Sequence, residues 1–208
     1  MKKLVILIPV YNDWESVYKL LEKIDSEIGQ QDIHVSVLIV NDASIEKRFR
    51  NKLTFKRIKS ARIINMKKNT GHARCNAAGL KFLIEKESFD FACLNFANPD
   101  MVGHTGDFDA AVKACEVVDI EVSKIVDSAK RMGYTILITA DHGNAEIMIN
   151  ADGSPHTYHT TNLVPFILIS ENRKFKLHDG KLGDIAPTIL DLMNISPPLE
   201  MTGVSLVK

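Results

Sequence analysis

Aspartate and histidine side chains recur in the second half of the sequence in arrangements that suit a metal ion. Asp100 and His104 lie four positions apart in NPDMVGHTGDFD, directly after an apolar run. Further candidates follow in ITADHGNAE and PHTYHTTN, namely Asp141, His142, His156 and His159. Carboxylate and imidazole ligands without cysteine favour Mn²⁺, Zn²⁺ or Fe²⁺ over Ca²⁺. An isolated Asp-Gly or His-Gly pair is more often a turn, so the metal interpretation requires the fold to bring these groups together.

The elements that would position these residues alternate along the chain. Continuous apolar runs predict buried strands at 4–10, 34–41, 61–66, 89–96, 134–139 and 163–170. Helical spacing of apolar residues predicts helices at 13–28, 71–86, 107–131 and 182–195. This alternation indicates an α/β fold with a mostly parallel sheet and helices on both faces, in three layers. The polar clusters follow the strands, so we expect them at the carboxyl edge of the sheet.

Bulk properties narrow the class of protein. The 208 residues are 45% apolar and 25% charged, as in a globular domain, and the net charge is zero. That charge is uneven: residues 1–90 hold 17 Lys and Arg against 11 Asp and Glu, which leaves 9 basic and 15 acidic residues in 91–208. Three cysteines without metal spacing predict a reducing, cytoplasmic location. No segment approaches the roughly 20 apolar residues of a membrane span, and we expect no nucleic-acid partner.

Four motifs in the second half resemble the C-terminal segment of cofactor-independent phosphoglycerate mutases, of the alkaline phosphatase-like superfamily. They are LNFANPDMVGHTGDFDAAVKACEVVD, ITADHGNAE, PHTYHTTNLVPFIL and DGKLGDIAPTILDLMNISPPLEMTGVSL. The resemblance implies two metal ions, usually Mn²⁺, and a small phosphorylated substrate. It assigns Asp100, His104 and His159 to one metal, and Asp141 and His142 to the other. His156 would be a neighbour that supports the ligands.

The same resemblance implies parts that have no matching motif in this chain. In that family a serine attacks the phosphomonoester, a further Asp completes the second metal site, and an inserted domain supplies arginines that grip the substrate. The serine and the Asp belong to the family's N-terminal segment, where this sequence reads differently. We therefore assign no catalytic residue, and we expect an incomplete two-metal site and impaired mutase activity.

The first half resembles a different family. LVILIPVYND, VLIVNDAS and NTGHARCNAAGL are similar to the start of family-2 glycosyltransferases, which bind nucleotide-sugars on an α/β fold. This resemblance implies nucleotide binding by Asp13, Asp42 and Arg74. The metal-binding Asp-x-Asp of those enzymes has no counterpart here. A helix cap is the alternative role for Asp13, and a turn residue is the alternative for Asp42.

The two resemblances together predict a fusion of a glycosyltransferase-like fragment, residues 1–90, with a mutase-like fragment, residues 91–208. The join falls within the expected strand at 89–96 without a linker. We therefore expect one continuous, mostly parallel sheet rather than two separate ones. The alternatives are a nucleotide-sugar glycosyltransferase and a non-catalytic fusion remnant.

Overall fold

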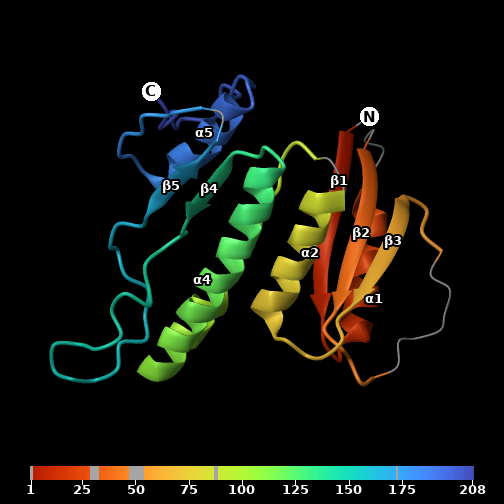
Figure 1. The fold of residues 1–208 in the computed structure, drawn as a ribbon, viewed down its shortest axis with the longest axis horizontal. Helices are drawn as coiled ribbons and strands as arrows, with labels where there is room; N and C mark the ends of the chain where they lie inside the picture. The colour runs from red at the N-terminus through yellow and green to blue at the C-terminus, as the bar shows by residue number, and fades with distance from the viewer. Residues whose placement is uncertain (1, 29–32, 47–53, 87–88, 172) are drawn as a thin grey trace. The chain divides into compact units, whose positions relative to one another are not determined.

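The computed structural model describes residues 2–28, 33–46, 54–86, 89–171 and 173–208 (Figure 1). The chain forms two compact units. Unit 1 comprises Met1–Met132 and Asn144–Tyr158, and unit 2 comprises Gly133–Gly143 and His159–Lys208. Within the described ranges, no helix is long and apolar enough to cross a membrane.

Unit 1 is built on a three-stranded parallel sheet. Strands β1 (Lys2–Val10), β2 (Ile33–Asn41) and β3 (Ile58–Asn65) lie in the order β1-β2-β3. Their register pairs Val10 with Asn41 and Asn41 with Asn65, so the three carboxyl ends are level. The polar residues that follow these strands therefore share one edge, as the sequence predicts.

Helices cover both faces of this sheet. Helix α1 (Trp14–Glu27) packs Trp14, Val17 and Leu21 into an apolar cluster with alternate sheet residues that include Ile8, Val37 and Ile39. Helix α2 (His72–Lys86) approaches the opposite face, because an added Cβ on Gly79 would meet Leu7 and Val40. The two sets of strand residues alternate, as side chains on opposite faces must. This arrangement confirms the predicted α/β class with helices on both faces.

Two further helices complete unit 1. Helix α4 (Phe108–Arg131) packs against α2, where Ser128 and Arg131 bond to Glu85 at 3.2 and 3.4 Å. The short helix α3 (Asn98–Gly103) precedes α4 and packs against it. Residues 144–158, which also belong to unit 1, form a short excursion. It turns at Gly153, which has a positive φ of 83°, and its arms pair through an Ile149–Pro155 bridge.

Unit 2 is smaller and has a sheet of its own. Strands β4 (Ile136–Thr139) and β5 (Phe166–Ile169) pair antiparallel. The 3₁₀ turn η1 (Leu182–Asp184) leads into α5 (Ile185–Leu192). Buried Asp184 accepts hydrogen bonds from the backbone N–H groups of Lys181 and Val204, both at 2.9 Å, and this ties the last residues of the chain to the helix.

Two sequence expectations about strands are wrong. Residues 91–97 are irregular and largely exposed, so the strand expected at 89–96 does not form. The described residues form two sheets, parallel β1-β2-β3 and antiparallel β4-β5, instead of one continuous sheet. An apolar run becomes a strand only where neighbouring strands satisfy its backbone hydrogen bonds, and none pairs with 91–97. The assignment of 1–90 and 91–208 to separate fragments stays a prediction.

Candidate metal centre

Asp100 and His104 are brought together by one turn of helix. Asp100 lies in the first turn of α3, and His104 ends the helix with its N–H bonded to the Asp100 carbonyl at 3.1 Å. Residues four apart share one helix face, and the His104 Nε2 lies 3.2 Å from the Asp100 Oδ1. Both side chains are partly exposed, at 42% and 34% respectively. The helical spacing read from the sequence therefore places two candidate ligand atoms side by side.

The excursion at 144–158 supplies a partner for each member of this pair. The Asn144 Nδ2 donates to the Asp100 Oδ1 at 3.0 Å. The His104 Nδ1 lies 2.7 Å from the Thr157 carbonyl oxygen. Because a carbonyl oxygen only accepts, the His104 Nδ1 must carry the hydrogen and donate it. In this tautomer the neutral ring keeps its lone pair on Nε2.

That arrangement is the one expected of a histidine prepared for a metal. Metal-binding histidines donate their other ring N–H to a carbonyl or carboxylate, which fixes the ring orientation. With a neutral His104, two acceptors, Nε2 and the Asp100 Oδ1, face each other at 3.2 Å. A cation placed between the two atoms would be bound by both. The donor set of unit 1 therefore fits a divalent ion with oxygen and nitrogen ligands.

Unit 2 carries three further candidates close to one another. The Asp141 Oδ1 lies 3.6 Å from the His142 Nε2. The His142 and His159 rings stack with centroids 3.7 Å apart and planes inclined by 18°. An antiparallel bridge between Gly143 and Thr160 sets this geometry, with the Thr160 N–H donating to the Gly143 carbonyl at 2.8 Å. The bridge thus holds the two imidazole rings side by side.

His156 lies in unit 1, and one of its two ring nitrogens is engaged by a hydrogen bond within that unit. Its Nδ1 lies 2.7 Å from the Asn150 Oδ1, and the ring meets Tyr158 edge-on with centroids 6.2 Å apart. Its Nε2 is buried and has no hydrogen-bond partner among the described residues. A supporting role for His156 stays a prediction.

The three residues that the glycosyltransferase resemblance singles out take part in structural contacts. Asp13 caps α1 by accepting from the Ser16 N–H at 3.2 Å. Asp42, only 4% exposed, accepts from the Thr70 N–H and hydroxyl and from the Gly71 N–H, at 2.8 to 2.9 Å. The Arg74 guanidinium lies 3.6 Å from Glu121 of α4. These contacts agree with the alternative roles of cap and turn residue.

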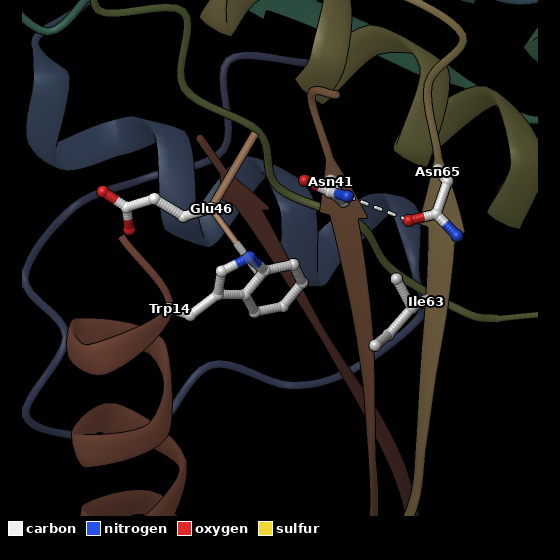
Figure 2. Close-up of a pocket in the computed structure, with 5 residues that line it drawn as sticks. All are labelled: Trp14, Asn41, Glu46, Ile63 and Asn65. Atoms are coloured by element: carbon white, nitrogen blue, oxygen red, sulfur yellow. Dashed lines mark hydrogen bonds between the residues drawn. The ribbon is translucent and has the colours of Figure 1, made fainter. Parts of the chain in front are cut away.

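A pocket of about 200 Å³ opens at the carboxyl edge of the three-stranded sheet (Figure 2). Its lining residues are Trp14, Asn41, Glu46, Ile63 and Asn65. Among these residues, the Asn41 amide donates to the Asn65 side-chain oxygen at 2.9 Å. None of the residues named by the two resemblances lines this pocket.

A family model described as the Metalloenzyme superfamily matches residues 21–197. This chain belongs to the Metalloenzyme superfamily. The match extends well into the first half, where the sequence suggested a glycosyltransferase-like fragment. No comparison supports a glycosyltransferase portion or a fusion.

Curated relatives of this Metalloenzyme superfamily chain are 2,3-bisphosphoglycerate-independent phosphoglycerate mutases. The mutase of Flavobacterium psychrophilum is 58% identical over 124 residues, which is 60% of this chain and 24% of the relative. That of Mycoplasma genitalium is 49% identical over 134 residues, covering 64% and 26%. The chain thus spans about a quarter of the length of these relatives. The resemblance of the second half to this family is confirmed.

A solved structure shares the fold. The crystal structure of Leishmania mexicana phosphoglycerate mutase at low cobalt concentration matches with a TM-score of 0.58 and 22% identity. The match covers 76% of this chain and 33% of that protein. It supports the α/β architecture.

Reasoning from the sequence missed the groups that hold the candidate ligands. Asn144 and the Thr157 carbonyl contact Asp100 and His104 from 44 and 53 residues away. The motif ITADHGNAE contains Asn144, but nothing in its spacing indicates which carboxylate it meets. A backbone carbonyl such as that of Thr157 leaves no trace in side-chain patterns.

Proposed function

We propose that this chain binds divalent metal ions and hydrolyses small phosphomonoesters, without interconverting phosphoglycerates. The observation that carries the proposal is the oriented pair in unit 1, in which Thr157 fixes His104 and Asn144 fixes Asp100. Membership of the Metalloenzyme superfamily and identity to mutases near 55% support it. A metal ion supplies positive charge for phosphoryl oxygens and lowers the pKa of a coordinated nucleophile.

The proposed ligands are the residues that the mutase resemblance assigns. Asp100, His104 and His159 would hold one ion, and Asp141 and His142 would contribute to a second. Mn²⁺ is the proposed metal, with Zn²⁺ and Fe²⁺ as alternatives that suit the same ligands. The free thiols of Cys75, Cys93 and Cys115 agree with a proposed cytoplasmic location.

Interconversion of phosphoglycerates demands more than metal binding. The phosphoryl group must be captured on the protein while the glycerate reorients in place. The four motifs that this sequence shares with the mutase family contain neither the family's nucleophilic serine nor its arginine-bearing domain. Water, which needs no dedicated residue, can replace the serine in hydrolysis.

Two assays on Mn²⁺-loaded protein from a mutase-deficient host test this proposal. We expect slow, chelator-sensitive hydrolysis of p-nitrophenyl phosphate and no conversion of 3-phosphoglycerate to 2-phosphoglycerate. His104→Ala should abolish the hydrolysis, whereas His72→Ala, at the exposed first residue of α2, should not change it. Robust mutase turnover, or hydrolysis that survives His104→Ala, would refute the proposal.

The second candidate function is binding of a nucleotide-sugar. The observation behind it is the pocket at the carboxyl edge of the three-stranded sheet. Open α/β sheets bind ligands at their carboxyl edge, and this pocket lies there with two amides, a carboxylate and an indole (Figure 2). Titration with uridine diphosphate in the absence of metal separates the candidates. Saturable binding that Asn65→Ala weakens would support the second.

A further inference from the structure

We propose that Asn144 positions the Asp100 carboxylate for metal binding, and that Gly103 is the glycine that leaves room for it. The inference rests on the proposed metal function of Asp100. It adds a positioning residue that lies outside the proposed ligand set and is supplied by the excursion of unit 1.

Asn144 is itself held on two sides. Its side chain is buried, with the residue only 7% exposed, and its Nδ2 donates to the Asp100 Oδ1 at 3.0 Å. Its backbone N–H donates to the Glu146 Oε2 at 2.6 Å. A charge-assisted bond of that kind is stronger than a neutral one. The main chain of Asn144 is thus held at the point from which its side chain reaches Asp100, as a positioning group requires.

The helix that carries Asp100 is shaped to receive the amide. Gly103 lies three residues after Asp100 on α3, so the two share a helix face. A Cβ added at Gly103 would collide with the Asn144 side-chain oxygen, and its distance to the Asn144 Cγ would be 3.0 Å. Any other residue at position 103 would push the amide away from the carboxylate. Gly103 and Asn144 therefore act as one interlocked pair.

Fixing one carboxylate oxygen matters because the same oxygen faces His104. The Asp100 Oδ1 accepts from Asn144 and lies 3.2 Å from the His104 Nε2. Without the amide, the Asp100 Oδ1 loses a donor that fixes its spacing from the His104 Nε2. Removing such supporting partners typically weakens metal binding by about 10–100-fold.

Titration of the full chain with Mn²⁺ in calorimetry tests the proposal. Asn144→Ala should weaken Mn²⁺ binding about 10–100-fold. Asn144→Leu keeps the side-chain volume but has no donor, so it should weaken Mn²⁺ binding to the same extent. It replaces the alanine variant if that variant folds poorly. The matched control is Asn76→Ala on α2, a similarly buried amide at 5% exposure, which should leave the affinity within about twofold.

A second experiment tests the contact between Gly103 and Asn144 by unfolding and needs no metal. Gly103→Ala should lower the unfolding midpoint in the wild-type background but much less in the Asn144→Ala background, because the collision partner is gone. Additive losses would overturn the interlock. If wild type binds Mn²⁺ and Asn144→Ala binds it with the same affinity, the role of Asn144 is overturned while the proposed function stands. No Mn²⁺ binding by wild type would overturn the proposed function and the role of Asn144 with it.

Discussion

Replacing Asp42 by alanine separates a structural role from a ligand-binding one. The carboxylate accepts three hydrogen bonds, from the Thr70 N–H and hydroxyl and from the Gly71 N–H, in the turn that begins α2. Bonds to charged groups contribute about 1.5–3 kcal/mol each when buried. Gly71 is exposed and Thr70 is half-buried, so water replaces part of each bond and about 1 kcal/mol apiece is the expected loss. Asp42→Ala should therefore destabilise unit 1 by about 3 kcal/mol.

The single tryptophan makes this measurable in unit 1. Trp14 is 3% exposed in the cluster beneath α1, so its fluorescence during urea denaturation reports on the unit that contains Asp42. Asp152→Ala is the matched control, because that carboxylate accepts from the Ser154 N–H and hydroxyl in an exposed turn. The control should change the free energy of unfolding by less than about 0.5 kcal/mol. A loss below about 1 kcal/mol for Asp42→Ala would refute the structural role.

Three further predictions follow from particular contacts. Burial raises the pKa of the Cys75 thiol to about 12, and the Asp42 charge adds to this, so titration with a thiol reagent at pH 8 should find Cys93 and Cys115 fast and Cys75 unreactive; fast reaction of all three would contradict it. Although burial alone would raise the pKa of Asp25, the N–H groups of Ile58, Lys56 and Arg57 lower it overall. The stabilisation by Asp25 is therefore present above the ordinary pKa near 3.8 and is lost as pH falls through the lower folded-state pKa. Asp25→Asn should thus flatten the acid limb of stability against pH, and an unchanged acid limb would count against this assignment. Gly79→Ala should cost about 1–3 kcal/mol in urea unfolding, because its Cβ would meet Leu7 and Val40; a neutral result would show that α2 shifts freely.

Local patterns predicted the local parts of the fold. The apolar spacing at 107–131 gave helix α4, and Asp13 caps α1 as its position suggests. The expected strand at 89–96 failed because an apolar run does not reveal whether a neighbour pairs with it. The pairing of Asp100 with His104 follows from helical spacing, whereas the contact of Asn144 with Asp100 depends on how the excursion folds back.

Of the two family resemblances read from the sequence, the comparisons support only one. The long motifs after residue 90 indicated a resemblance to the mutase family, and the comparisons confirm that resemblance. The short motifs around Asp13 and Asp42 occur wherever a strand ends in a polar turn before a helix. In this chain those turns hold α1 and α2 in place.

The Mn²⁺ content after chelator-free purification tests most directly whether Asp100 and His104 are metal ligands. Elemental analysis of wild type, His104→Ala, His142→Ala and His72→Ala should show bound metal in wild type and His72→Ala. We expect a larger loss of metal for His104→Ala than for His142→Ala, because the family resemblance assigns more ligands to the site that contains His104. Metal-free wild-type protein that also fails to take up added Mn²⁺, or equal metal content in all four proteins, would contradict the central claim.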